Sequence, residues 1–140
     1  MSVAAGRASG PQQSVLALVE ALNSANLRAA IDCFADEACL VTPDATAVEG
    51  RGEIRAVLAQ MTARGVQIAV LRSSFLVAGR VALGSERWAI RHASAGEEGF
   101  EQVSSATMVL HRAGALWKLA IAAPWGWGGQ VRRLPMQALA

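Results

Sequence analysis

The chain has 140 residues, 53% of them apolar and 17% charged, and 13 basic against 11 acidic residues leave a formal net charge of +2. This is the length of a single domain, and the basic residues are scattered instead of following one predicted face, which argues against nucleic acid as a partner. Charged and amide residues interrupt every apolar stretch before the roughly 18 residues that a membrane span needs, so we expect no membrane partner either.

The first 13 residues, MSVAAGRASGPQQ, contain one Arg but no continuous apolar run of the kind found in a secretory signal. We therefore expect a cytoplasmic protein with a disordered segment over 1–13. Cys33 and Cys39 are six positions apart with no histidine between them, which matches neither a CxxC redox pair nor a zinc site. We expect two reduced, buried thiols, no bound metal and no cofactor.

Three stretches near the start repeat their apolar residues at helical spacing. They cover 14–22, 27–34 and 52–64. Asn26 can cap the second helix, and Gly65 can stop the third. The pattern therefore predicts three N-terminal helices, the first two joined by a short elbow.

The rest of the chain has the pattern of strands. Residues 39–42 form a predicted short strand with 46–48 as its hairpin partner, and period-two alternation then continues through four longer runs. These runs cover 66–78, 80–92, 100–112 and 115–123. Helices followed by a meander of strands indicate an α+β fold, with the helices packed on a curved antiparallel sheet. We place the domain at 14–127 and a C-terminal tail at 128–140.

Four motifs occur in order along the chain: ALNSANL, FADEA, EGRGEIR and LWKLAIAAPWG. Through them the stretch 14–127 resembles the SnoaL-like branch of the nuclear-transport-factor-2-like superfamily. The resemblance implies a cone-shaped α+β barrel with a pocket between helices and sheet, commonly paired into a homodimer through the outer sheet face. It does not fix the function, because this fold hosts isomerases, cyclases, epoxide hydrolases, dehydratases and proteins without catalysis.

The segment 19–43 is also similar, without a gap, to bacterial ketosteroid isomerases. Those enzymes combine a carboxylate base with an oxyanion hole made of a Tyr and a protonated Asp. The three positions, carried over one at a time, fall here on Thr42, Leu18 and Ala106. A Thr hydroxyl cannot take a proton from carbon at neutral pH, and the other two side chains have no polar group. The resemblance thus implies an isomerase scaffold without isomerase chemistry, and we expect no shift of a β,γ-unsaturated ketone.

The most charged strand, 80–92, can face the interior with either of two side-chain sets. One set includes Glu86 and Trp88, the other includes Arg87, and alternation alone does not choose between them. A carboxylate turned into an apolar pocket could act as an acid or base, so Glu86 is the first catalytic candidate, together with Arg87 and Thr42. The alternative for Glu86 is an ion pair or exposure at a dimer edge.

The last two strands are predicted to pair across the turn at Ala113-Gly114. The predicted inner pairs are Leu110 with Trp117, Met108 with Leu119 and Ala106 with Ile121. The opposite face is mixed in character, and we expect it to contact a second subunit. His92 and His111 lie near strand ends, where we expect solvent or a subunit contact.

The expected pocket lining is a mostly apolar set from the helices and strands. Its members are Leu18, Leu22, Thr42, Val57, Met61, Trp88, Ala106, Met108, Trp117 and Trp125. For Trp117 and Met108 the alternative is packing in the core, and for Trp125 a contact with a partner subunit.

Two functions remain open at this stage. One is binding of a small hydrophobic molecule without chemistry. The other is an isomerase, cyclase or hydratase acting on a small hydrophobic ketone or polyketide-like substrate. A Glu86 or Arg87 that points into the cavity, within hydrogen-bond reach of Thr42 or a Ser, would favour the enzyme, and an all-apolar cavity would favour binding.

Overall fold

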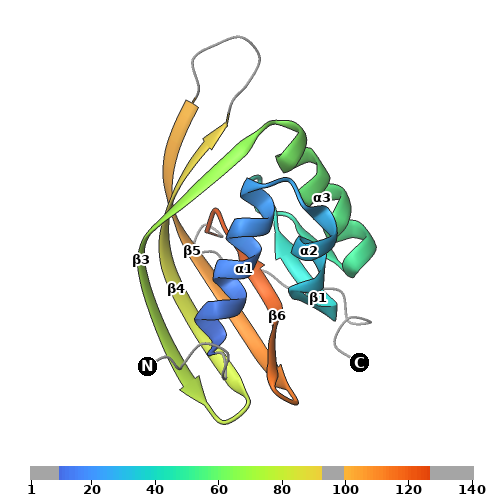
Figure 1. The fold of residues 1–140 in the computed structure, drawn as a ribbon, viewed down its shortest axis with the longest axis vertical. Coiled ribbons are helices and arrows are strands. Elements are labelled where there is room, and N and C mark those ends of the chain that lie inside the picture. The colour runs from blue at the N-terminus through green and yellow to red at the C-terminus, as the bar shows by residue number, and fades with distance from the viewer. Residues whose placement is uncertain (1–9, 93–99, 127–140) are drawn as a thin grey trace.

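The structure is a computed structural model that describes residues 10–92 and 100–126 (Figure 1). Its elements are α1 (Pro11–Asn23), α2 (Leu27–Asp32), β1 (Phe34–Val41), β2 (Ala47–Glu49), α3 (Arg51–Ala63), β3 (Val66–Ala78), β4 (Val81–His92), β5 (Phe100–Ala113) and β6 (Leu116–Ala123). The strands form one six-stranded sheet in the order β2-β1-β6-β5-β4-β3. The sheet curves without closing, since β2 and β3 are its edges, so the expected barrel is an open curved sheet.

The sequence analysis placed one segment at each end of the chain, 1–13 and 128–140, and the structure bears on them differently. The first helix begins at Pro11, so the last residues of the segment 1–13 belong to α1. Proline suits the first turn of a helix, where its missing N–H has no intrahelical partner to lose. The proposed tail, 128–140, lies outside the described residues. No helix in the described ranges combines the length and apolar character needed to cross a membrane.

The prediction of an antiparallel sheet is wrong at one position, because β1 pairs with β6 in parallel. Leu40 lies opposite Ala122 in this pair. Parallel neighbours need a long crossover connection, and here α3 and β3 to β5 all lie between the two strands along the chain. A pattern of local alternation carries no information about such a distant pairing.

The second helix is shorter than predicted. It ends at Asp32, and Phe34, which the helical spacing assigned to that helix, is instead the first residue of β1. The backbone N–H of Leu119 in β6 donates to the carbonyl of Cys33 at 2.8 Å. This hydrogen bond joins the residue after α2 to β6, so the chain continues as a strand from Phe34, which is fully buried.

The register of β5 and β6 differs from the prediction by two positions. Ala113 pairs with Leu116, so the loop is Gly114-Ala115, and Gly114 has the positive φ that the first position of a tight hairpin loop favours. As a result Leu110 lies opposite Leu119 instead of Trp117. Beyond a one-residue bulge the difference grows to three positions, and Met108 lies opposite Ala122 instead of Leu119.

A bulge after Val109 then reverses the side on which Ile121 lies. The predicted inner pair of Ile121 with Ala106 is therefore wrong. Ile121 lies opposite Val109 on the outer face with 42% of its surface exposed, and its neighbour Ala122 takes the buried position. A bulge adds one unpaired residue, which local alternation cannot reveal.

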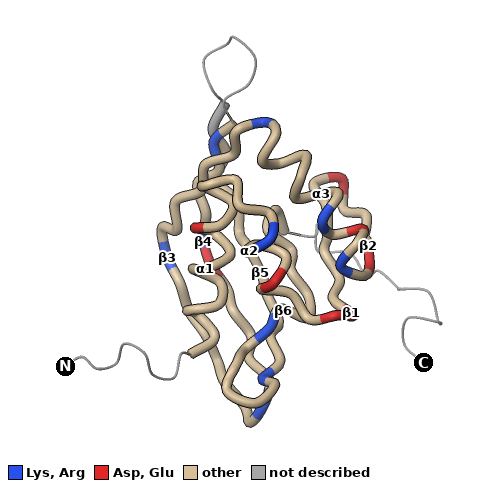
Figure 2. Tube along the Cα trace, turned by 45° about the vertical axis from the view of Figure 1, so that its right-hand side comes forward, with Lys and Arg blue, Asp and Glu red and all other residues tan. Residues whose placement is uncertain are grey.

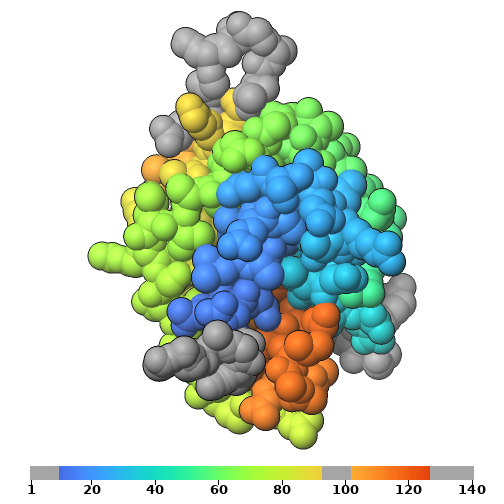
Figure 3. All heavy atoms as spheres, viewed as in Figure 1, coloured from blue at the N-terminus to red at the C-terminus, as the bar shows by residue number. Residues whose placement is uncertain are grey.

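The core lies between the helices and the concave face of the sheet. On α1 the buried residues Val15, Leu18, Val19 and Leu22 form one stripe at helical spacing. They pack with the inner residues of the strands, of which Trp88, Phe34 and Leu40 are among the largest fully buried ones. Figure 3 shows α1 and α2 covering this side of the molecule, with β6 emerging below them. Charged positions are dispersed along the trace (Figure 2).

One arginine fixes the start of α3. Arg51 follows Gly50, whose φ of 86° allows the sharp entry into the helix. Its Nη2 donates to the carbonyls of Ile31 and Phe34 at 3.3 and 3.0 Å, and its Nη1 lies 3.6 Å from the carboxylate of Asp36. Arg51 thus ties α3 to the end of α2 and the start of β1, which sets the position of the residues along α3.

Candidate functional site

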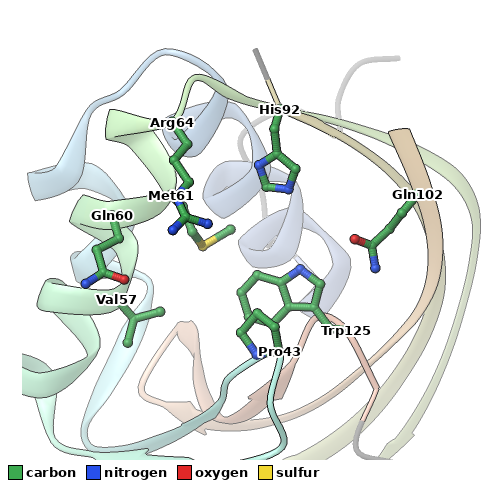
Figure 4. A pocket seen from close by; sticks show the side chains of 8 residues that line it. All are labelled: Pro43, Val57, Gln60, Met61, Arg64, His92, Gln102 and Trp125. Atoms are coloured by element: carbon green, nitrogen blue, oxygen red, sulfur yellow. The ribbon is translucent and has the colours of Figure 1, made fainter. Parts of the chain in front are cut away.

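A pocket opens between α3 and the adjacent ends of β1, β4, β5 and β6 (Figure 4). Its volume is about 260 Å³. The described residues that line it are Pro43, Val57, Gln60, Met61, Arg64, His92, Gln102 and Trp125. They come from five elements or their ends, so only the folded sheet brings them together.

The helix supplies half of this lining. Val57, Gln60, Met61 and Arg64 have the spacing i, i+3, i+4 and i+7, which places them on one face of α3. The sequence analysis predicted Val57 and Met61 as lining residues and missed Gln60 and Arg64. The same helical spacing, filled in at i+3 and continued to i+7 from Val57, could have found both.

The strands supply His92 and Gln102 from neighbouring positions on the inner face. His92 is the last residue of β4, and Gln102 lies opposite Ile90 in the pairing of β4 with β5. The expectation that His92 faces solvent or a subunit contact is wrong, because alternation continues to the strand end and turns it into the pocket wall. His111 is exposed on the outer face, as predicted.

Trp125 is held in place by the segment that leaves β6. The hydroxyl of Ser104, buried on β5, donates to the carbonyl of Pro124 at 2.8 Å. The N–H of Gly126 donates to the carbonyl of Ala123 at 3.1 Å and closes a turn around Trp125. This turn presents the indole to the pocket next to Pro43 (Figure 4).

The pocket combines an apolar side with a polar one. Val57, Met61 and Trp125 offer carbon, sulfur and indole surface, while Arg64 at the end of α3 and His92 at the end of β4 extend toward the opening (Figure 4). Such an arrangement can bury an apolar molecule and orient one polar group on it. Imidazole is also the side chain that most commonly transfers a proton near neutral pH.

Three of the predicted lining residues, Val57, Met61 and Trp125, lie in this pocket. Most of the others are buried in the core: Leu18, Leu22, Trp88, Ala106, Met108 and Trp117. Thr42 lies in the turn after β1, where its hydroxyl donates to the carboxylate of Asp44 at 2.5 Å.

The structure resolves which face of β4 is inward. Glu86 faces the interior and is 3% exposed, whereas Arg87 is exposed on the outer face. The carboxylate of Glu86 accepts hydrogen bonds from the indole Nε1 of Trp88 at 2.7 Å and from the hydroxyl of Ser73 at 2.5 Å.

The three catalytic candidates, Glu86, Arg87 and Thr42, therefore lie in different places. None of them lines the pocket described above. Along β4, His92 lies six positions after Glu86, or about 20 Å of extended strand.

The cysteines are free thiols, Cys39 buried and Cys33 partly buried. Burial raises the pKa of both, so the thiol form dominates at neutral pH. Within residues 10–92 and 100–126, no group of three or more His, Cys, Asp and Glu side chains is arranged to hold a metal ion.

Comparison with known families adds to this geometry. The profile of the SnoaL-like domain family matches residues 12–121, which is most of the chain. The chain belongs to the SnoaL-like domain family. Among curated proteins, no sequence matches this SnoaL-like domain.

Solved structures share its fold at low sequence identity. A proposed dehydratase of the nuclear-transport-factor-2-like family from Streptomyces avermitilis has a TM-score of 0.72 and 21% identity, over 81% of this chain and 92% of that one. A proposed ketosteroid isomerase from Shewanella frigidimarina has a TM-score of 0.72 and 15% identity, over 84% and 96%.

A third structure, a protein of unknown function from Mycobacterium tuberculosis, has a TM-score of 0.72 and 15% identity, over 92% of this chain and 73% of that one. At these identities the likeness shows the fold alone. It agrees with the family assignment and with the curved sheet of the SnoaL-like domain.

Proposed function

We propose that this SnoaL-like domain binds a small hydrophobic molecule in the pocket between α3 and the sheet. The observation that carries the proposal is the apolar side of the pocket, formed by Val57, Met61 and Trp125. The volume of about 260 Å³ lies just below the range of roughly 300 to 1,000 Å³ that is common for ligand pockets. This favours a ligand of modest size.

A rough affinity follows from the area that such a ligand can bury. Covering about 250 Å² of apolar surface yields about 6 kcal/mol at 25 cal/mol per Å², before the cost of association. Binding in the micromolar to millimolar range is therefore expected for a purely apolar molecule.

The test is binding of the neutral ketone 4-phenyl-2-butanone, measured by calorimetry. Val57→Trp fills the pocket from α3 and should abolish binding. Arg55→Trp is the matched control, because Arg55 is exposed on the same helix and does not line the pocket. Circular dichroism verifies that both variants fold. Equal binding by wild type and Val57→Trp would refute the proposal.

A second candidate is an isomerase, cyclase or hydratase acting on a small hydrophobic ketone or polyketide-like substrate. The observation in its favour is His92, an acid–base group on the pocket wall, with Arg64 also extending toward the opening. His92 would transfer a proton next to the carbonyl, and Arg64 would stabilise negative charge on the oxygen. The names of the Streptomyces and Shewanella structures are compatible with such chemistry.

The variant His92→Gln distinguishes the binding function from the enzymatic one. If the domain is an enzyme, this variant should lose turnover by a factor of about 100 or more while it still binds 4-phenyl-2-butanone. We expect no turnover of a β,γ-unsaturated ketosteroid, because the ketosteroid isomerase positions are Thr42, Leu18 and Ala106. A screen of hydrophobic ketones without any His92-dependent reaction would favour binding alone.

We also propose a homodimer formed through the outer face of β4 to β6. This face exposes Leu83, Val103, Leu116 and Ile121, with 58% of Leu116 accessible. Neighbouring exposed apolar residues on a sheet favour burial against a second copy. Leu83→Glu should convert a dimer to a monomer in light scattering, whereas Leu16→Glu on the exposed side of α1 should not. A monomeric wild type would refute this part.

A further inference from the structure

The two arginines at the ends of α3, Arg51 and Arg64, differ in the hydrogen bonds and ion pairs of their side chains. Arg51 is held by two carbonyls and lies near two carboxylates. The side chain of Arg64, at the C-terminal end of the same helix, forms no hydrogen bond or ion pair with any described residue, yet lines the pocket. In Figure 4 its guanidinium extends from the helix end toward the open space beside Met61. Arg64 is therefore available to a ligand, whereas Arg51 serves the fold.

The other polar groups around the opening suit an anion. None of the described lining residues is Asp or Glu, and Arg64 is the one permanently charged residue among them. Gln60 and Gln102 add amide N–H donors, and His92 adds an imidazole. A guanidinium can bind both oxygens of a carboxylate with two parallel hydrogen bonds. One fixed positive charge matches one negative charge, which favours a monoanion.

The rest of the pocket suits an apolar body attached to that anion. The indole of Trp125 and the thioether of Met61 form adaptable apolar surface, and the small volume leaves room for one ring or a short chain. We propose that the ligand of this pocket is a small amphipathic carboxylate whose carboxylate is bound by Arg64 and whose apolar body packs on Trp125. This inference rests on the binding function proposed above and names its ligand class.

The test compares two probes of nearly equal shape, 4-phenylbutyrate and its neutral amide 4-phenylbutanamide. Calorimetry with wild type should give a dissociation constant at least about fivefold lower for the acid, because a hydrogen bond to a charged group contributes more than a neutral one. The preference should shrink as ionic strength rises, since the pocket is open to solvent.

Variants of Arg64 assign this preference to one residue. Arg64→Gln should weaken acid binding about fivefold or more, leave amide binding within twofold, and remove the preference. Arg64→Lys should retain part of it. Arg55→Gln is the matched control, since it removes the same charge from the far side of the helix, about 200° from Val57. It should change nothing beyond twofold. Neither the Arg64 nor the Arg55 side chain has a described hydrogen-bond or ion-pair partner, so none of these variants should lower the melting temperature.

Three outcomes would overturn the inference. The first is equal binding of acid and amide by wild type. The second is equal loss of acid binding in Arg64→Gln and Arg55→Gln, which would indicate net charge alone. The third is binding of 4-phenyl-2-butanone, blocked by Val57→Trp, with no binding of 4-phenylbutyrate. In each of these three outcomes, binding of 4-phenyl-2-butanone would leave the proposed binding of a hydrophobic molecule intact. Absence of binding by the ketone, the acid and the amide would refute both.

Discussion

The side-chain amide of Asn23 holds the backbone of Ile68 through two hydrogen bonds. Its Nδ2 donates to the Ile68 carbonyl at 2.9 Å, and its Oδ1 accepts from the Ile68 N–H at 2.7 Å. Ile68 lies on β3, an edge of the sheet. Here an amide at the end of α1 takes the place that a neighbouring strand would occupy, which satisfies part of an otherwise open edge.

Replacing Asn23 should therefore destabilise the fold. Asn23→Ala removes both hydrogen bonds and should lower the free energy of unfolding by about 1–3 kcal/mol, measured by urea denaturation. Asn23→Asp should also destabilise, because it places a carboxylate oxygen against the Ile68 carbonyl. Ser24→Ala is the control, since Ser24 is exposed and its hydroxyl bonds only within α1. Equal stability of Asn23→Ala and Ser24→Ala would contradict this role.

Two glycines should respond to alanine in opposite directions. A Cβ on Gly84 would overlap the ring of Phe75 on β3, so Gly84→Ala must displace that ring and should cost about 1–3 kcal/mol. A Cβ on Gly52 within α3 meets nothing within 4 Å. Gly52→Ala should therefore stabilise the protein by about 0.5–1 kcal/mol through helix propensity.

Thermal denaturation of both variants measures this difference. The combination of Gly84→Ala with Phe75→Leu should recover part of the lost stability, because the smaller side chain leaves room for the new methyl group. A Gly84→Ala variant as stable as wild type would show that the ring moves aside without cost.

Glu86 should prove structural instead of catalytic. Glu86→Gln replaces one acceptor oxygen with an amide that cannot accept from Trp88 or Ser73, and should cost about 1–2 kcal/mol. Binding of 4-phenyl-2-butanone should remain within twofold of wild type, since Glu86 does not line the pocket. Ser73→Ala in the same background should show coupling in a double-mutant cycle. A variant of normal stability that loses ligand binding would reverse this assignment.

The long strands could be predicted from sequence because alternation and the glycines between strands are local signals. The ranges 66–78, 80–92, 100–112 and 115–123 agree with β3 to β6 within one residue at each end. What local signals could not supply is the relation between strands. The bulge beyond Val109 changes which residues face inward, and the parallel pairing of β1 with β6 depends on a crossover.

The candidate site likewise combines residues that local sequence patterns can predict with residues that only strand pairing brings together. Val57 and Met61 could be predicted from the apolar spacing of α3, and Gln60 and Arg64 follow the same spacing. His92 and Gln102 approach these residues only because β4 and β5 pair in one register. The inward face of β4 was undetermined because both of its faces contain apolar and charged residues. Burial of Trp88 against the helices decides it, and that contact is not local.

Asp44 should titrate below an ordinary Asp because of the turn that contains it. The hydroxyl of Thr42 donates to its carboxylate at 2.5 Å and lowers the pKa of Asp44, with smaller contributions from Thr46. A carboxyl with a lowered pKa in the folded state stabilises the protein above the pKa of the unfolded chain. This contribution is lost as pH falls through the lower, folded value.

NMR titration of the Asp44 carboxyl carbon measures the effect of Thr42. Thr42→Val should move the pKa of Asp44 up toward its ordinary value, and Thr42→Ser, which keeps the hydroxyl, should not. In acid, Thr42→Val should also show a weaker dependence of stability on pH. An unchanged Asp44 titration in Thr42→Val would mean that the other hydrogen bonds suffice.

At alkaline pH the two buried thiols should reduce the stability of the folded protein. Burial raises the pKa of Cys33 and of Cys39, and Lys118 opposes this effect at Cys33. Because the folded thiols hold their protons to higher pH than unfolded ones, stability is complete below the usual thiol pKa and falls as pH rises above it. Below that range, alkylation by iodoacetamide should be slower than in the urea-unfolded chain, since only the thiolate reacts.

Lys118→Met isolates the electrostatic part of this effect. Without the nearby ammonium group, the pKa of Cys33 should rise further and its alkylation should slow, while Cys39 remains unchanged. Mass spectrometry of the alkylated peptides follows each thiol separately. Cys33→Ala and Cys39→Ala should each reduce the loss of stability above the usual thiol pKa. A steeper loss in either variant would show that the thiols do not cause it.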